Sequence, residues 1–140
     1  MINAFNAMAQ RLQASFNHLR QQLMQDRLTA LLTRHGLLEQ AHWSGYKSTV
    51  LCLIELDGFR PLNDHLGHAT GDRLLQAVAQ RMKEHQPQAL LMARVGGNEF
   101  ALLHEVHETC ASESSLGAST LALFDQPFAS GDDKVVLSAC

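Results

Sequence analysis

Two short segments of the chain carry side chains that could do chemistry. The apolar run 50–56 carries the acidic residue Glu55 near its end, and Asp57 follows the run directly. Much later, the glycine-rich link 96–98 is followed at once by Glu99. If the strands that bear these segments pair, their carboxylates would gather beside a glycine turn whose backbone can approach phosphate closely. Oxygen ligands in that arrangement suit Mg²⁺ and a nucleoside triphosphate.

The pattern has a plainer explanation as well, because an ordinary hairpin with surface acids would look the same. Two histidine pairs, His65 with His68 and His104 with His107, have HxxH spacing, but two histidines on one element do not close a zinc site. The segment 104–108 reads HEVHE, which lacks the second histidine of an HExxH motif. We find no supporting motif for a Ser/His/Asp or Cys/His arrangement, so we assign no nucleophile.

Strands are needed to position the acidic segments. Residues 50–56 read VLCLIEL, a continuous apolar run whose length and Val/Ile content favour a buried central strand. The apolar runs 89–95 and 99–106 flank a Gly-Gly-Asn link, and such a short link predicts a hairpin. Residues 131–134, GDDK, predict a turn, after which VVLSA begins a further strand.

Helices are expected between these strands. Residues 28–42 carry leucines at helical spacing, and a loop with a short helix follows the first strand. Thr70 or Asp72 would cap the next helix, which Pro87 ends. Residues 108–125 are expected to form another helix. The apolar face of the helix before Pro87 consists of Leu74, Leu75, Val78, Ala79 and Met82.

The N-terminal residues 2–24 predict one long amphipathic helix. Its apolar residues recur at steps of three and four, while Gln, Arg, Asn and Ser fill the other faces. The helix cannot bury this stripe by itself, so either a second copy of the helix covers it or the helix folds back onto the domain. The stripe consists of Phe5, Met8, Leu12, Phe16, Leu19 and Leu23.

Helices that alternate with buried strands around a hairpin indicate an α/β (α+β) fold. We predict a palm-like or ferredoxin-like sandwich, with a mixed, mainly antiparallel sheet covered by helices. At 140 residues the chain supports one domain with a real core. Its last residues lie inside a strand pattern, so we expect the C-terminal part of the domain to be missing.

Composition narrows the functional classes. The net charge is −3 and hydrophobic residues make up 46% of the chain, so nothing indicates a nucleic-acid partner. We find no apolar run long enough for a membrane span and no signal peptide. The three cysteines, Cys52, Cys110 and Cys140, form no CxxC pair, which is typical of reduced thiols in a cytoplasmic protein.

Several segments resemble the GGDEF domain of the diguanylate cyclase family, in order and at its spacing. DRLTALLTR (26–34) resembles its opening motif DxLTGLxNR, and ELDGFRPLND (55–64) resembles DxDxFKxIND. GHATGD (67–72) resembles GHxxGD, and ARVGGNEF (93–100) resembles the signature ARxGG(D/E)EF. Together with the VVLSA strand, the resemblance covers about residues 26–140.

The resemblance implies an activity. Members of this family condense two GTP molecules into cyclic di-GMP and release two pyrophosphates. Each subunit of a homodimer holds one GTP, and divalent ions, Mg²⁺ or Mn²⁺, bridge the phosphates. The opening INAFNAMAQRL resembles the end of a HAMP linker, a signalling coil just inside a bacterial membrane.

The resemblance also implies a role for each matching residue. Glu55 and the backbone carbonyl of Leu56 would bind metal. Glu99 would serve in metal binding and catalysis, together with Asn98 in a degenerate form. The residues implied to bind substrate are Asn63 and Asp72 for guanine, Arg60 near the phosphates, and Gly96 and Gly97 of the signature loop.

Two departures from the family pattern affect the metal positions. Glu55 keeps the negative charge of the aspartate that the family has at this position, but its side chain is one methylene longer. This matters because Mg²⁺ demands tight octahedral geometry from its ligands. Asn98 brings an amide oxygen but no negative charge and no base. The RxxD motif that many members use for product inhibition is also absent, since Pro87 and Leu90 stand at its two defining positions.

We therefore expect a catalytically impaired GGDEF domain that acts as a GTP-binding, regulatory or dimerisation module. The alternatives are an active diguanylate cyclase and a purely structural dimerisation domain. We expect residues 1–25 to be a signalling or coiled-coil helix and residues 26–140 to be the C-terminally truncated GGDEF domain. The parent protein is then expected to have an upstream sensory region in the inner membrane, and could have a downstream phosphodiesterase domain.

Overall fold

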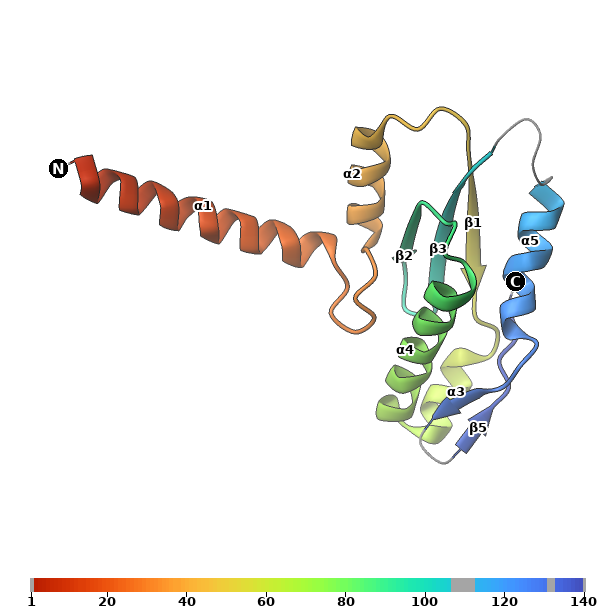
Figure 1. The fold of residues 1–140 in the computed structure, drawn as a ribbon. Coiled ribbons are helices and arrows are strands. Elements are labelled where there is room, and N and C mark those ends of the chain that lie inside the picture. The colour runs from red at the N-terminus through yellow and green to blue at the C-terminus, as the bar shows by residue number, and fades with distance from the viewer. Residues whose placement is uncertain (1, 107–112, 131–132, 140) are drawn as a thin grey trace.

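The computed structural model describes residues 2–106, 113–130 and 133–139. Helices and strands alternate along the chain, and Figure 1 shows their arrangement. In order they are α1 (Ile2–Met24), α2 (Arg34–Ser44), β1 (Thr49–Glu55), α3 (Phe59–Leu66), α4 (His68–His85), β2 (Leu91–Arg94), β3 (Glu99–Glu105), α5 (Glu113–Leu121), the 3₁₀-helix η1 (Ala122–Phe124), β4 (Phe128–Ser130) and β5 (Asp133–Val135).

Helix α1 projects away from the rest of the domain (Figure 1). The six apolar residues of its stripe, Phe5 to Leu23, are each between 59% and 72% exposed. The stripe is thus not buried against the body of the domain, and of the two expectations for this helix, the folded-back arrangement is wrong. Within the described residues, no helix is both long enough and apolar enough to cross a membrane.

The helix predicted over 28–42 begins later than expected, because residues 26–33 form a compact turn. The Asp26 carboxylate accepts hydrogen bonds from the backbone N–H of Thr29 at 2.9 Å and from its hydroxyl at 2.7 Å. Ala30 then adopts a left-handed conformation, with φ of 62°. Local side-chain bonds of this kind compete with helix formation, so α2 starts only at Arg34.

Thr33 joins the end of α1 to the start of α2. Its hydroxyl accepts a hydrogen bond from the backbone N–H of Gly36 at 3.0 Å, which caps α2, and donates one to the carbonyl of Leu23. The two helices approach so closely that a Cβ at Gly36 would lie 2.2 Å from the carbonyl oxygen of Met24. Only glycine fits at that contact.

The main sheet has the strand order β1-β3-β2, and both pairings are antiparallel. The predicted hairpin is therefore confirmed as β2 and β3. Strand β1 lies beside β3 at an edge of this three-stranded sheet, with Leu51 and Leu53 exposed, so the buried central position predicted for it is wrong for the described strands. The mixed character predicted for the sheet is wrong for the described strands, where the one parallel contact is an isolated bridge between Leu32 and Ala93. Strands β4 and β5 form a separate small hairpin.

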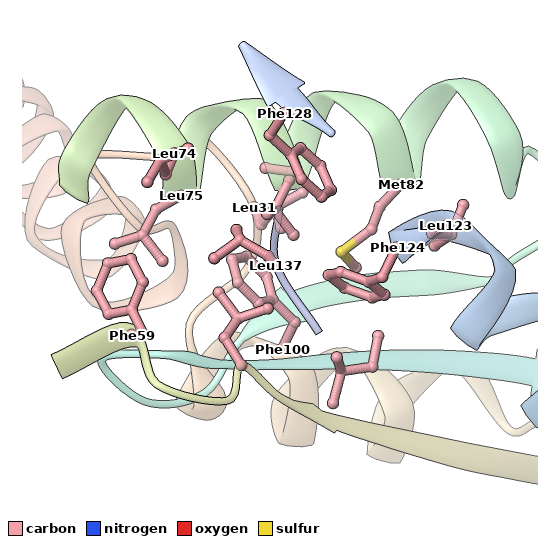
Figure 2. Close-up of a cluster of buried hydrophobic side chains, with 14 of the residues drawn as sticks. Leu31, Phe59, Leu74, Leu75, Met82, Phe100, Leu123, Phe124, Phe128 and Leu137 are labelled. Atoms are coloured by element: carbon pink, nitrogen blue, oxygen red, sulfur yellow. The ribbon is translucent and has the colours of Figure 1, made fainter. Parts of the chain in front are cut away.

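Helices cover both faces of the sheet. On one face, α4 sends Leu74, Leu75 and Met82 toward Phe100 of β3, and the core continues to Phe128 of β4 (Figure 2). On the other face a smaller cluster joins Leu37 of α2 to Ala93 and Ala101 of the sheet. The apolar face predicted for the helix before Pro87 is confirmed, since all five of its residues are buried in α4.

Three local expectations are corrected. Helix α4 begins at His68 after Gly67, without a side-chain cap, so Thr70 and Asp72 lie inside the helix and do not cap it. The helix predicted over 108–125 is observed as α5 followed by η1, and its first residues, like His107 and Cys110, lie outside the described residues. Of the predicted turn 131–134, residues 131–132 also lie outside them, and the remaining two belong to β5.

Ala30 provides a test of the turn before α2. A left-handed conformation costs a residue with a Cβ about 1–2 kcal/mol, whereas glycine adopts it freely but adds entropy to the unfolded chain. We expect Ala30→Gly to raise the free energy of unfolding by up to about 1 kcal/mol in urea titrations. The control is Ala118→Gly in α5, which should lower it by roughly 0.5–1 kcal/mol. Equal losses in the two variants would contradict the strain at Ala30.

Candidate functional site

The end of β1 and the loop between β2 and β3 form the first part of the candidate site. The register places Glu55 directly opposite Glu99, so the two side chains lie on the same face of the sheet, and both residues are exposed. Like charges directly opposite each other are destabilising in a sheet. Glu55 and Glu99 line a hollow of about 400 Å³ whose other walls are apolar.

Gly96 permits the position of the Glu99 side chain. A Cβ at Gly96 would lie 2.9 Å from Oε2 of Glu99 and 3.2 Å from its Cβ, which is too close for an unchanged side chain. Gly97 has open space where a Cβ would be. The two signature glycines thus differ in role, because only Gly96 is needed for a close approach within this structure.

Asn98 exchanges two hydrogen bonds with Leu56, the residue after β1. The backbone N–H of Leu56 donates to the carbonyl of Asn98 at 3.0 Å, and the side-chain Nδ2 of Asn98 donates to the carbonyl of Leu56 at 2.9 Å. The structure therefore brings all four residues predicted as metal ligands to one strand end, since Glu55 and Glu99 adjoin the bonded pair of Leu56 and Asn98.

Arg94 links the same loop to the turn after α1, a role that sequence analysis did not identify. Its Nη2 donates to the carbonyl of Gly97 at 2.9 Å, and its Nη1 lies 3.4 Å from Oδ1 of Asp26. Burial acts to raise the pKa of Asp26, but hydrogen bonds from Thr29 and the charge of Arg94 outweigh it and leave that pKa below its ordinary value. Both residues lie in motifs quoted above, although nothing in the sequence pairs them.

The second part of the candidate site lies on α3 and α4. Nδ2 of Asn63 lies 2.8 Å from Nδ1 of His68, and since the amide nitrogen can only donate, the histidine nitrogen accepts. A Cβ at Gly71 would lie 2.0 Å from Oδ1 of Asn63, so the glycine makes room for this amide. His68 and Gly71 thus fix the half-buried Asn63, next to the exposed Asp72.

The remaining predicted residues make no described contact that joins the two parts of the candidate site. Arg60 is exposed in the first turn of α3, and α3 follows β1 through Gly58, which has φ of 65°. In the described parts of the chain, no hydrogen bond or ion pair connects the strand-end group to Asn63 or Asp72. His104 is buried on β3 and burial lowers its pKa, while His107, the other histidine of the HxxH spacing, lies outside the described residues.

The strand-end group does not fit a site for two divalent ions. In the ranges that the structure describes, we find no group of three or more His, Cys, Asp and Glu side chains placed to hold a metal. Two carboxylates face each other, but Asn98 directs an N–H donor at the Leu56 carbonyl that the family resemblance implies as a ligand. The Asn98 amide hydrogen carries a partial positive charge, so it would repel a cation bound to the same Leu56 carbonyl oxygen.

Comparison with known proteins gives a consistent result. A family model described as diguanylate cyclase, GGDEF domain, matches residues 23–139. The diguanylate cyclase DgcP of Pseudomonas aeruginosa is 33% identical over 113 residues, which are 74% of this chain and 17% of DgcP. MucR of the same species, a bifunctional diguanylate cyclase and cyclic di-GMP phosphodiesterase, is 34% identical over 122 residues, which are 83% of this chain and 18% of MucR. The chain thus spans less than a fifth of either relative.

A solved structure matches over nearly the whole chain. The coiled coil and GGDEF domain of DgcB from Caulobacter crescentus, in complex with cyclic di-GMP, has a TM-score of 0.73 at 21% identity. The match covers 99% of this chain and 77% of that one. At this identity the likeness shows the fold alone.

The contact between Asp26 and Arg94 should be measurable as a coupling energy. In a double-mutant cycle of Asp26→Asn and Arg94→Met, we expect a coupling of roughly 1 kcal/mol at pH 7, since both groups are about four-fifths buried. Because the folded-state pKa of Asp26 is lowered, its stabilisation is complete above the unfolded pKa near 4 and is lost as the pH falls through the folded value.

Urea titrations of the four proteins at pH 7 and at successively lower pH provide the measurement. The coupling should shrink as the pH falls below about 4. A coupling near zero at pH 7, or one unchanged in acid, would contradict the assigned contact.

Proposed function

The chain belongs to the GGDEF domain family of diguanylate cyclases, and from this premise we propose that it is a GTP-binding or regulatory GGDEF domain with impaired catalysis. It would act within a longer cyclic di-GMP signalling protein. The single observation that carries the proposal is the hydrogen bond from Asn98 to the carbonyl of Leu56. It occurs at the signature position where the family pattern has an acid.

Catalysis should suffer for an electrostatic reason. Cyclase chemistry builds up negative charge on phosphate oxygens, and metal-binding acids hold the ions that offset it. Asn98 supplies no charge, and Glu55 carries its carboxylate one methylene further from the backbone than an aspartate would. Loss of one such acid should remove several kcal/mol of transition-state stabilisation, which corresponds to roughly a thousandfold or more in rate.

Guanine recognition should suffer less, because it depends on other residues. Asn63 is oriented by His68 and Gly71, and Asp72 remains exposed on α4 as an acceptor. A carboxylate and an amide match the mixed donors and acceptors of guanine. Arg60 and the signature glycines would contact the phosphates. This set supports GTP binding by a domain that turns GTP over poorly.

We further propose what adjoins the GGDEF domain in the parent protein. We assign residues 1–25 to a HAMP-like signalling helix and residues 26–140 to the GGDEF domain. Since MucR combines cyclase and phosphodiesterase functions, we also propose a downstream phosphodiesterase domain in the parent protein. A purely structural dimerisation role is the second candidate, and the exposed stripe of α1 favours it.

Calorimetric titration with GTP separates nucleotide binding from a purely structural role. We expect the chain to bind GTP and Asp72→Ala to lose the binding, because the carboxylate that accepts from guanine is gone. The matched control is Asp64→Ala, an exposed acid on the neighbouring α3 that should leave binding unchanged. Absence of GTP binding by the unaltered chain would exclude the proposed nucleotide role.

Asn98→Asp tests the cause of the impaired catalysis. We expect the unaltered chain to form little or no cyclic di-GMP from GTP and Mg²⁺, and the variant to form it at least tenfold faster, because the missing acid is restored. Product is quantified by chromatography. Rapid turnover by the unaltered chain would instead identify an active cyclase, and no gain in a variant that still binds GTP would contradict the electrostatic explanation.

Dimerisation through α1 can be tested by sedimentation. Leu12 lies in the middle of the exposed stripe, and Gln10 lies on the opposite side of the helix. We expect the chain to sediment as a dimer, Leu12→Glu to shift it toward monomer, and Gln10→Glu to remain dimeric, because only the first puts charge into the apolar seam. A monomer at all concentrations would contradict a dimerisation role for α1.

A further inference from the structure

The bond between Asn98 and Leu56 extends the pairing of β1 and β3 by one step. Each residue donates once and accepts once, at 3.0 Å and 2.9 Å, but the donor on Asn98 is its side-chain amide and not its backbone N–H. Leu56 is 1% exposed, so an unpaired carbonyl here would be costly. The side chain of residue 98 is therefore part of what closes the loop onto the strand end.

The amide is suited to this place because it is a neutral donor. An aspartate would direct a carboxylate oxygen at the Leu56 carbonyl, and two acceptors cannot bond without a hydrogen or a cation between them. It would also add a third negative charge next in sequence to Glu99, which already faces Glu55 across the strands. An acid here would thus need a counter-ion that an asparagine does not.

We propose that the Asn98 amide closes the loop onto β1 in place of a divalent cation, so that this domain folds and keeps its signature loop in position without metal. The amide N–H carries the positive end of a dipole toward the carbonyl, and the hydrogen bond replaces a bridge through an ion. The inference goes beyond the proposed function, because it concerns the unliganded chain and holds whether or not GTP binds.

Thermal unfolding in EDTA and in millimolar Mg²⁺, without nucleotide, tests the proposal. The unaltered chain should have the same Tm in both within about 1 °C, since ligand binding to the folded state would raise it. Asn98→Asp should lower the Tm in EDTA by roughly 5 °C or more and regain much of that loss as Mg²⁺ is titrated in. Asn17→Asp, on exposed α1, is the control for one added charge and should show no Mg²⁺ dependence.

Asn98→Ala provides a second variant that does not depend on charge. It removes the donor without adding an acceptor, so its Tm should fall and should not respond to Mg²⁺. A Tm of the unaltered chain that rises with Mg²⁺ as much as that of Asn98→Asp would overturn the proposal. An Asn98→Asp protein as stable in EDTA as the unaltered chain would overturn it as well.

Discussion

The antiparallel pairing of β1 with β3 is the interaction on which the rest of the site depends. It brings together residues that are far apart in the sequence, so that Glu55 faces Glu99 and Leu56 meets Asn98. The pairing is secured from one face by the core between α4 and Phe100, and from the other by the contact of α2 with the sheet. Because side chains alternate between the two faces along each strand, a slip of one residue between β1 and β3 would put Glu55 and Glu99 on opposite faces of the sheet.

At residue 98, the difference between an amide and a carboxylate decides whether the end of β1 is closed by a hydrogen bond or would need a cation. A carboxylate at this position favours the binding of a divalent cation, which can in turn bind the phosphates of a nucleotide. The amide supplies its own donor and satisfies the buried carbonyl of Leu56 directly. In our proposals, the loop is thereby held without an ion, and the negative charge that would hold a metal ion for phosphoryl transfer is missing. Asn63 on α3 depends on other contacts, with His68 and Gly71, and is not altered by this exchange.

The turn after α1 connects the N-terminal helix to the same loop. Asp26 closes the turn through Thr29 and lies against Arg94, whose guanidinium also binds the Gly97 carbonyl. At the other side of the turn, the Thr33 hydroxyl bonds both the end of α1 and the start of α2. A change in the direction of α1 would therefore act on contacts that reach the signature loop. These contacts form a continuous physical path between α1 and the signature loop.

The sequence by itself determined the element types, the hairpin, the apolar face of α4 and the family, because these depend on periodicity, glycine links and motif spacing that local residues encode. It misplaced the start of α2, where side-chain bonds at Asp26 and Thr33 and the left-handed Ala30 override the leucine pattern. Only the tertiary structure decided which way α1 points and that Arg94 meets Asp26. It also decided which oxygen the Asn98 amide bonds. These features rest on contacts between distant residues, whose geometry is set by the pairing of strands and the packing of the core.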